Sequence, residues 1–381
     1  MGFYDNFIDE RHELVRQTAR EFAEDEIAPH VVEWEEAGQF PRDLYHEAAE
    51  AGLLGVGFSE EIGGAGGGAM DEVMVIEGLM YGGSTGVMAG LGSLGIALPP
   101  LVQAGDDHLI ENFARPALAG DKIAALAITE PGAGSDVTGV RTRADRDGDE
   151  YVVHGSKIFI TSGVRADFLT ALVRTGEDRH EGLTFLVIET DREGVRVSKA
   201  LKKTGWCASD TAELAFDGVR VPVDNRVGSE GDGFQTLMRN FQNERLALAA
   251  YGAAASEVAL EETERYVQER EVFDRSVSDF QVTQHKLADM ATQVTAAKTL
   301  VYQLASRMEA GEYLVEEVSM AKNFCAEVAH EVTYEAVQLH GGMGYMRETM
   351  VERLSRDARL LPIGGGTQEI MKEIIAKQRD Y

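Results

Sequence analysis

One carboxylate in the second half of the chain has surroundings that would change its acidity. Glu244 is flanked by apolar residues at i−7, i−3, i+3, i+4 and i+7, positions that share one face of a helix. These neighbours are Leu237, Phe241, Ala247, Leu248 and Tyr251. A carboxylate on such a face loses water, is easier to protonate, and is therefore a candidate general base. A buried Glu neutralised by the adjacent Arg245 also fits the pattern, and the pattern alone favours that structural interpretation.

A glycine-rich loop near the middle of the chain would let a ligand approach the backbone closely. Residues 128–136 read I-T-E-P-G-A-G-S-D. Gly132 and Gly134 carry no side chain that would block a flat or phosphorylated ligand. Thr129 and Ser135 add hydroxyls that can donate or accept hydrogen bonds. The same composition also fits an ordinary polar turn between two elements.

Two further glycine loops and one basic segment are candidates for binding anions. Residues 339–345 (L-H-G-G-M-G-Y) and 363–367 (I-G-G-G-T) adjoin helices, and the second loop leads into the last helix. The free N–H groups at that helix N-terminus could meet an anion or a polarised carbonyl. Within residues 270–281, Arg270 and Arg275 are basic points in an acidic protein and could clamp a phosphate. Helix caps and a surface connection are the structural alternatives.

Composition argues against several classes of function. The chain has 381 residues, 44% of them hydrophobic and 27% charged, as expected for a globular protein with a sizeable core. Its 36 Lys and Arg against 65 Asp and Glu give a net charge of −29, which disfavours nucleic acid and anionic membranes as partners. Cys207 and Cys325 lie outside any CxxC spacing, so we expect neither a disulfide framework nor a metal site. No apolar run has the length of a membrane span, and the polar N-terminal segment favours a cytoplasmic protein.

The spacing of apolar residues divides the chain into three parts. Residues 1–120 have helical spacing, residues 121–230 carry short β-branched and aromatic runs, and residues 231–381 return to helical spacing. Strands are expected over residues 151–161, 168–174, 183–190, 195–200 and 212–221. Such regular strands, separated by turn clusters, predict a small antiparallel barrel or sandwich. The later helices are expected over residues 234–270, 281–309, 314–339 and 367–378, which suits a bundle.

The first part is expected to contain several helices. They are expected over residues 11–34, from Pro41 to about Gly52, and over residues 70–81 and 86–98. The last of these contains Gly90-x-Gly92-x-x-Gly95, a formal match to the dinucleotide fingerprint. Because the match follows no strand and no βαβ unit surrounds it, we assign these glycines to close helix packing.

Together these motifs resemble the acyl-CoA dehydrogenase family. Six segments carry the resemblance in family order: residues 128–136, G-S-K-I-F-I-T-S-G at 155–163, S-D-T-A-E-L at 209–214, R-x-x-F with a later Q from Arg270 to Gln281, Q-L-H-G-G-M-G-Y at 338–345, and G-G-T-Q-E-I at 365–370. The resemblance implies an α+β fold with an N-terminal α-helical domain, a middle antiparallel β-barrel domain and a C-terminal four-helix bundle. The order of helical, β and helical parts agrees with that architecture.

The resemblance implies an FAD bound between the barrel and the bundle. Family positions at or near the flavin correspond here to Leu126, Ile128, Thr129, Ser135, Phe159, Thr161, Thr367 and Glu369. Ser135 would also lie near CoA, and Phe159 stands where many relatives carry Trp. A second set would reach the FAD of a neighbouring subunit: Arg270, Phe273, Gln281, Gln338, Gly341 and Gly342. Asp274 stands where relatives usually have Gly, so it would bring a negative charge near the pyrophosphate.

The reaction implied is the α,β-dehydrogenation of an acyl-CoA thioester to the trans-2-enoyl-CoA. A carboxylate removes the α-proton, flavin N5 accepts the β-hydride, and the electrons pass to electron-transfer flavoprotein. Many relatives carry the base just before the Gly-Thr of the last loop, where this chain has Gly365. The long-chain and isovaleryl branches instead place it on the first bundle helix within E-R-L, which matches Glu244-Arg245-Leu246. Glu244 is therefore the predicted base.

Substrate contacts are expected from residues that adjoin this base and the glycine loops. They are Ser135, Gln242, Arg245, Gly365 and Gly366. The Gly365 N–H could still donate to the thioester carbonyl. The resemblance also implies a homotetramer arranged as a dimer of dimers, and it leaves acyl chain length and branching open. Two alternatives are a flavin oxidase or monooxygenase on the same scaffold, and a non-catalytic acyl-CoA-binding relative.

Overall fold

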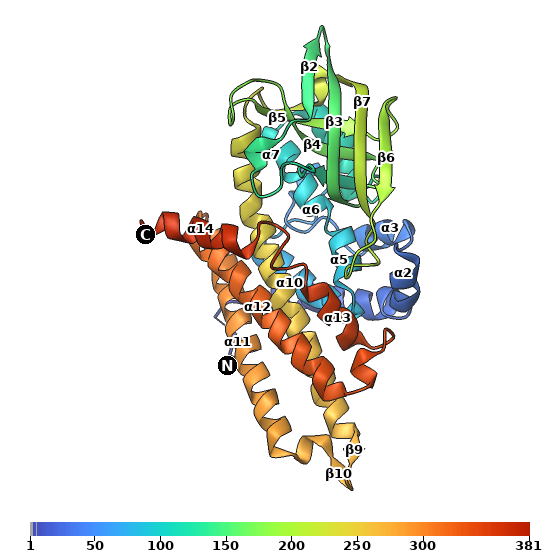
Figure 1. Cartoon of the computed structure of the whole chain (residues 1–381), viewed down its shortest axis with the longest axis vertical. Coiled ribbons are helices and arrows are strands. Elements are labelled where there is room, and N and C mark those ends of the chain that lie inside the picture. The colour runs from blue at the N-terminus through green and yellow to red at the C-terminus, as the bar shows by residue number, and fades with distance from the viewer. Residues whose placement is uncertain (1–2, 5) are drawn as a thin grey trace.

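The computed structural model describes residues 3–4 and 6–381, and its three parts follow one another along the chain (Figure 1). Helices make up the first part, a sheet forms the second, and long helices form the third. In Figure 1 the sheet lies at the top and the long helices extend below it. One buried core joins residues of all three parts, so the N-terminal helices pack against both of the others.

The N-terminal part consists of short α-helices. They are α1 (Glu10–Phe22), α2 (Val31–Ala37), α3 (Asp43–Glu50), α4 (Ala69–Leu79), α5 (Thr85–Leu91), α6 (Leu94–Ala97), α7 (Pro99–Ala104), α8 (Asp107–Leu109) and α9 (Arg115–Leu118). The helix expected over residues 11–34 is interrupted by a π-helical turn at Ala23–Ile27 and a turn that contains Pro29. Proline lacks the N–H that a continuous helix needs at that point.

The helix expected over residues 86–98 is broken between α5 and α6. Pro99 and Pro100 then open α7 instead of ending the helical run, because proline fits the first turn of a helix. The packing interpretation is confirmed for Gly90, where an added Cβ would lie 2.4 Å from the ring of Phe40. It is wrong for Gly95, where an added Cβ would meet no atom within 4 Å.

Within the described part of the chain, no single helix has both the length and the hydropathy needed to cross a membrane. By length and composition alone, one bent pair of helical segments meets the criteria for a membrane span. The segments are Thr85–Leu91 and Leu94–Ala104, and they meet at 45°. Every residue of Thr85–Leu91 is buried in the protein core.

Among the described residues, eight strands form the sheet of the middle part. They are β1 (Ala124–Ala127), β2 (Arg143–Asp147), β3 (Glu150–Thr161), β4 (Phe168–Arg174), β5 (Leu183–Glu189), β6 (Val195–Ala200), β7 (Thr211–Pro222) and β8 (Arg226–Val227). Their hydrogen-bonded order is β6-β7-β3-β2-β4-β5-β8, with β1 beside β4. Most neighbours are antiparallel, as predicted, whereas β4 pairs in parallel with β1 and β2. The hydrogen-bonded path is open, because β6 and β8 are its two ends.

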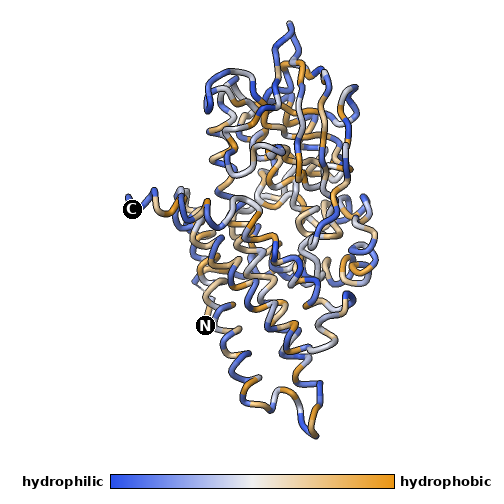
Figure 2. The backbone as a smooth tube through the Cα atoms, in the orientation of Figure 1, coloured by the Kyte–Doolittle hydropathy of each residue, from blue (hydrophilic) through white to orange (hydrophobic). Residues whose placement is uncertain are grey.

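The central strand β4 is buried on both faces because each face covers a different core. Phe168 and Leu172 join the core that continues into the helices. Leu169 and Val173 point into a second core enclosed by the sheet itself. Figure 2 shows hydrophobic segments within the sheet and a hydrophilic tip where β2 meets β3. This double burial holds β1, and the glycine-rich loop that follows it, firmly at the boundary with the helices.

Long helices form the C-terminal part. They are α10 (Gly233–Glu269), α11 (Gln281–Glu309) and α12 (Val315–His340), followed by α13 (Met350–Ala358), which was not predicted, and α14 (Gln368–Gln378). A hairpin of β9 (Glu271–Val272) and β10 (Arg275–Ser276) joins α10 to α11. α14 packs across α12 instead of running along it (Figure 1). α4 packs against α10 and α11, so the N-terminal part completes the bundle.

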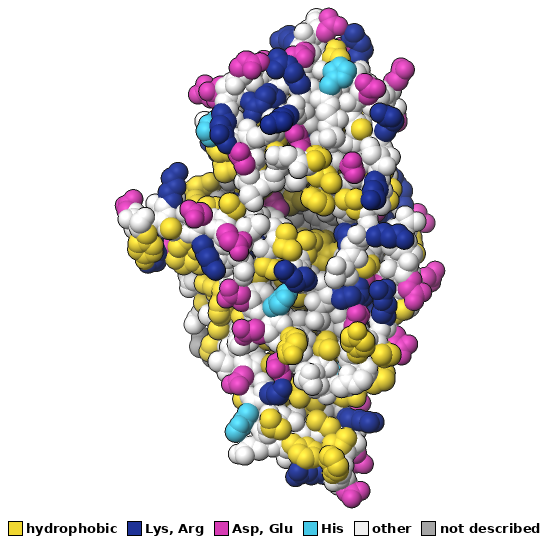
Figure 3. Space-filling view, viewed as in Figure 1, with side chains coloured by type: hydrophobic (Ala, Val, Ile, Leu, Met, Phe, Trp, Pro, Cys, Tyr) yellow, Lys and Arg dark blue, Asp and Glu magenta, His cyan; other side chains and the backbone are white. Residues whose placement is uncertain are grey.

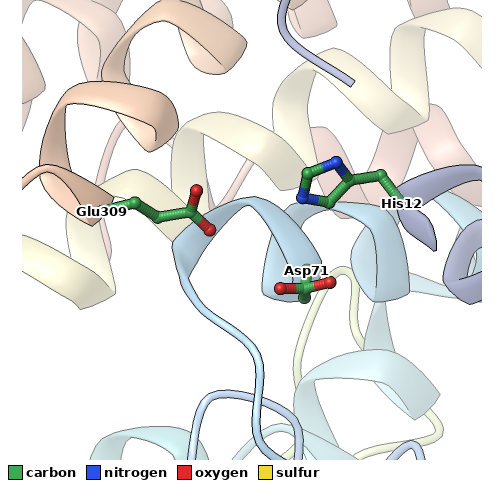
Figure 4. A group of neighbouring side chains, drawn as sticks. All are labelled: His12, Asp71 and Glu309. Carbon is green, nitrogen blue, oxygen red and sulfur yellow. The ribbon is translucent and has the colours of Figure 1, made fainter. Parts of the chain in front are cut away.

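A cluster of charged side chains fastens α1 and α4 to the end of α11 (Figure 4). Glu309 Oε1 accepts the N–H of Met70 at 2.8 Å, and Asp71 Oδ2 accepts from Arg11 Nη2 at 2.9 Å. His12, Asp71 and Glu309 place ligand atoms within 4.8 Å of one another, a spacing that a metal ion could use. The Arg11 guanidinium already supplies a cation there, 3.3 Å from His12 Nε2. We therefore assign this cluster a structural role.

Candidate active site

Glu244 is half-buried on α10, and its surroundings favour the neutral acid. Burial raises the pKa of its carboxyl, although the positive charges of Arg245 and Lys322 oppose the shift. Its Oε2 atom is buried and accepts no hydrogen bond among the described residues. Neither cation comes within the ion-pair distance of 4.0 Å. Glu244 therefore forms no ion pair among the described residues, and its raised pKa suits a group that takes up a proton.

The loop before α14 passes close to Glu244. Gly365 and Gly366 have φ angles of 62° and 101°, in the left-handed region that favours glycine. A Cβ added to Gly365 would lie 2.3 Å from Leu248 Cδ1 and 3.4 Å from Glu244 Oε1. Position 365 thus adjoins Glu244, and a side chain there would meet Leu248 first.

Two buried cations hold the carbonyl groups of this loop. Arg245 Nε donates to the Gly365 carbonyl at 3.4 Å, and Lys322 on α12 donates from Nζ to the Gly366 carbonyl. Burial lowers the pKa of Lys322 to about 8; Arg245 adds to this effect and Glu244 opposes it. The sequence patterns did not predict Lys322, although a lone Lys among the buried positions of α12 was a signal for it.

An apolar cavity of about 130 Å³ lies beside Glu244. It is lined from α4, α5, α6, α10 and the segment after α3 by side chains that include Leu54, Phe58, Val75, Ile76, Leu91 and Leu94. Gly92 and Gly95 also line it, so the break between α5 and α6 leaves room for a ligand. Figure 3 shows the surface hollowed between the sheet and the helices, with hydrophobic side chains around the hollow. Such a cavity suits an aliphatic chain.

The glycine-rich loop after β1 is fastened firmly to β3. The Thr129 carbonyl accepts the N–H of Ile158 at 2.9 Å. Glu130 pairs with the buried Lys157 at 2.9 Å and also accepts the N–H groups of residues 141 and 142. Burial alone would raise the pKa of Glu130, but Lys157 and these donors outweigh it and hold the pKa below its usual value. Glu130, to which the sequence patterns assigned no role, therefore fixes the loop.

The outer side of the same loop is open. A Cβ added at Gly132 or Gly134 would meet no atom within 4 Å, so a ligand can approach the backbone there. Ser135 is exposed at the end of the loop. The loop is thus an ordered turn whose outer backbone is accessible to a ligand. Both interpretations of its composition therefore fit the structure.

A β-bulge in β3 turns an aromatic ring outward beside this loop. The pairing of β3 with β7 shifts register between Lys157 and Ile160, and Phe159 has a φ of 62°. The Phe159 side chain is 65% exposed, which is unusual for a large apolar residue. An exposed ring beside an accessible stretch of backbone fits a flat group such as a flavin.

The other predicted flavin contacts lie on the same elements. Leu126 is half-buried on β1, Ile128 is buried after it, and Thr161 is half-buried at the end of β3. At the start of α14, Thr367 Oγ1 accepts the N–H of Ile370 at 3.3 Å and caps the helix. Glu369 is exposed in the first turn, where a backbone N–H and the Thr367 hydroxyl lower the pKa of its carboxyl. Their contacts with FAD stay predictions.

The second predicted cofactor set lies at the other end of the bundle. Its members are on the β9–β10 hairpin, at the start of α11 and at the end of α12: Arg270, Phe273, Gln281, Gln338, Gly341 and Gly342. In Figure 1 this end is at the bottom, below α14 and the sheet. Phe273 is 89% exposed there. The structure therefore does not bring this set to Glu244 in the same chain, and an exposed location agrees with the predicted contact to a neighbouring subunit.

Asp274 keeps the turn geometry that a glycine would give. Phe273 and Asp274 have φ angles of 52° and 61°, as in a two-residue hairpin turn. Aspartate adopts this conformation more readily than most residues. The departure from the family pattern is thus a change of charge rather than of backbone.

Tyr266 stacks on His340 with ring centroids 4.2 Å apart, which joins the end of α10 to the end of α12.

Gln242, a predicted substrate contact, faces away from the cavity. It is buried two positions before Glu244, and its Oε1 accepts no hydrogen bond among the residues that the structure describes. Two residues correspond to about 200° around a helix. The cavity is lined instead by other residues of α10: Asn243, Glu244, Ala247 and Tyr251. The other predicted substrate contacts, Ser135, Arg245, Gly365 and Gly366, do not line this cavity either, so all five contacts stay predictions.

Three family models match the chain and together cover most of it. They are described as the acyl-CoA dehydrogenase N-terminal, middle and C-terminal domains, and they match residues 9–121, 125–219 and 231–379. The mitochondrial long-chain specific acyl-CoA dehydrogenase of Sus scrofa is 39% identical over 370 residues, which are 96% of this chain and 86% of that protein. A subunit of the caffeyl-CoA reductase-Etf complex of Acetobacterium woodii is 34% identical and covers 97% of this chain and 98% of its own. The crystal structure of a probable acyl-CoA dehydrogenase from Mycobacterium abscessus is 52% identical, with a TM-score of 0.96 over 98% of this chain and 100% of the other.

The chain therefore belongs to the acyl-CoA dehydrogenase family, whose members are FAD-dependent oxidoreductases. This membership confirms the predicted fold, enzyme class and cofactor.

Proposed function

We propose that this enzyme oxidises an acyl-CoA thioester between Cα and Cβ to the trans-2-enoyl-CoA, with Glu244 as the base. The observation that carries the proposal is the position of Glu244. Its carboxylate lines an apolar cavity, lacks an ion pair among the described residues, and adjoins the Gly365 loop. A base of this kind, set beside a cavity that suits an acyl chain, fits removal of an α-proton.

The loop before α14 would polarise the thioester carbonyl. An α-proton is only weakly acidic, so the carbonyl oxygen must be stabilised while the proton leaves. Within the described chain, Gly365 and Gly366 do not use their N–H groups in backbone hydrogen bonds. Arg245 and Lys322 hold the carbonyls of Gly365 and Gly366, and this orients the two peptide planes that carry the N–H groups of Gly366 and Thr367. The loop thus offers oriented donors beside a desolvated base.

FAD, when bound, supplies the acceptor for the hydride from Cβ. Thr129, Phe159, Thr161 and Thr367 would hold its ring. We propose that the exposed set around Phe273 and Gln338 completes the cofactor site of a neighbouring subunit in a homotetramer. The exposure of Phe273 and its distance along the bundle from the flavin loop support this arrangement.

We further propose that electrons pass to electron-transfer flavoprotein and that the enzyme serves fatty acid β-oxidation in the cytoplasm. The relative from Acetobacterium woodii, a subunit of a complex with Etf, supports the choice of acceptor. The free thiols of Cys207 and Cys325 agree with a reducing compartment.

Anaerobic mixing of the holoenzyme with saturated acyl-CoA thioesters tests the function. We expect bleaching of the flavin and a product two mass units lighter than the substrate. Bound FAD that no thioester of a graded series bleaches would indicate a non-catalytic binding protein. Rapid reoxidation in air with formation of peroxide would indicate an oxidase.

A further inference from the structure

The cavity beside Glu244 contains a second carboxylate. Glu72, on α4, lines the same wall. Within residues 3–4 and 6–381, its carboxylate makes no hydrogen bond and no ion pair within 4.0 Å. Burial raises the pKa of Glu72 to about 7, and the negative charges of Asp71 and Glu309 add to that effect. This group is therefore present in both protonation states near neutral pH and has no partner in the protein.

The absence of a side chain at Gly57 leaves space for the Glu72 carboxylate. Gly57 has a φ of 85°, and an added Cβ there would lie 1.9 Å from Glu72 Oε1. A residue with a side chain at position 57 would displace the carboxylate from its place. Neighbouring positions 56 and 58 also line the cavity, so this segment and α4 form one wall.

Tyr251 adds a second polar group to the cavity. It lies on the same face of α10 as Glu244, and an added Cβ at Gly92 would be 2.9 Å from its hydroxyl oxygen. Burial raises the pKa of Tyr251, and the charges of Glu244 and Glu72 add to the effect, so the hydroxyl stays protonated. In the described chain this hydroxyl forms no hydrogen bond. Asn243, the remaining polar residue of the lining, is exposed.

The chemistry of this wall selects among acyl chains. Polar groups in an apolar cavity are costly unless a ligand or water pairs with them, and a plain hydrocarbon tail would leave both Glu72 and Tyr251 unpaired. A tail that ends in a carboxylate would be repelled by ionised Glu72, the carboxylate of this wall. An ammonium would lose its water against an otherwise aliphatic wall. A neutral hydroxyl both donates and accepts, so it can pair with Glu72 in either protonation state.

We propose that Glu72 and Tyr251 form a polar subsite for a hydroxyl group carried by the acyl chain beyond Cβ, so that hydroxylated acyl-CoA thioesters are the preferred substrates. This inference rests on the proposed function, because it takes the cavity as the acyl site. It assigns Glu72 to substrate selection and leaves proton removal to Glu244.

The test uses the holoenzyme and pairs of acyl-CoA thioesters of graded length, each with and without a terminal hydroxyl. At one chain length the hydroxylated member should reduce the flavin about tenfold more efficiently, as expected for one good hydrogen bond to a carboxyl group. Glu72→Leu should bring this ratio close to one, and Tyr251→Phe should lower it less. Glu72→Gln, which keeps hydrogen-bonding atoms, should retain part of the preference.

Binding measured by calorimetry on the Glu244→Gln holoenzyme separates this subsite from the chemistry. There too the hydroxylated thioester should bind about tenfold more tightly than its plain counterpart. Equal affinities at every length, an unchanged ratio in Glu72→Leu, or tighter binding of thioesters with a terminal carboxylate or amine would overturn the subsite. Failure of the wild-type enzyme to be bleached by any thioester would overturn the proposed function instead, whatever the binding preference.

Discussion

A Cβ added to Gly365 would lie 3.4 Å from the Oε1 atom of Glu244, so the loop before α14 and this carboxylate on α10 are direct neighbours. The same Cβ would lie 2.3 Å from Leu248 Cδ1. Position 365 therefore adjoins the Glu244 carboxylate, and a side chain there would first displace Leu248.

Gly365→Ala should slow flavin reduction by roughly tenfold or more. The new methyl group meets Leu248, and the φ of 62° disfavours any side chain by about 1–2 kcal/mol, so the loop should shift. A displacement of the donors by about 1 Å can slow a reaction by up to about a hundredfold. Gly364→Ala is the matched control, because a Cβ there would have no neighbour closer than 3.8 Å. Stopped-flow bleaching compares the two variants, and equal rates in both would contradict the steric account.

The rate of flavin reduction should rise with pH as Glu244 loses its proton. Only the carboxylate can accept the α-proton, and burial raises its pKa above the ordinary value of 4.5. The rate should therefore fall on acidification at a higher pH than an exposed Glu would cause. Single-turnover rates across pH measure the midpoint, with Glu264→Gln on the same helix as the control. A midpoint at the ordinary value would show that Glu244 is not desolvated in the working enzyme.

Lys322→Met should shift that midpoint to higher pH and slow the reaction. The ammonium of Lys322 lowers the pKa of Glu244 and donates to the Gly366 carbonyl, and Met removes both effects. Lys322→Arg keeps the positive charge, so its midpoint should stay nearer that of the wild type. If Met and Arg variants share the wild-type midpoint and differ only in stability, Lys322 has a structural role alone.

Glu130→Gln should destabilise the protein by about 3–5 kcal/mol, because it leaves the buried ammonium of Lys157 without its carboxylate. The glycine-rich loop should loosen with it, so the variant should also retain less FAD. Urea unfolding and the flavin content after gel filtration measure the two effects. Glu130→Gln with Lys157→Met removes the unpaired charge and should be more stable than Glu130→Gln alone. A double variant that is less stable than the single variant would contradict this explanation.

Periodicity predicted the elements whose two faces differ strongly in burial. The predicted limits of α11 and β4, residues 281–309 and 168–174, coincide with those of the structure. β2 was missed because four of its five residues are exposed and most are charged, which leaves no apolar alternation. α13 was missed because it is short and two of its buried positions, Arg353 and Asp357, are charged.

The candidate site was predictable where its pattern is local. The neighbours that bury Glu244 lie within two turns of the same helix, so spacing alone revealed its environment. Lys322 and Glu72 reach the site from α12 and α4, and no local spacing pairs either element with α10. Gln242 was assigned by motif, and because it does not line the cavity beside Glu244, its substrate contact stays a prediction.

Anaerobic flavin reduction in the Glu244→Gln variant tests the central claim most directly. The amide has nearly the same shape but cannot take up the α-proton. The variant should therefore keep its FAD and still bind acyl-CoA, while reduction slows roughly a hundredfold to ten-thousandfold. Glu264→Gln, on the same helix, should be reduced at the wild-type rate. Bleaching of Glu244→Gln at the wild-type rate would contradict the assignment of Glu244 as the base.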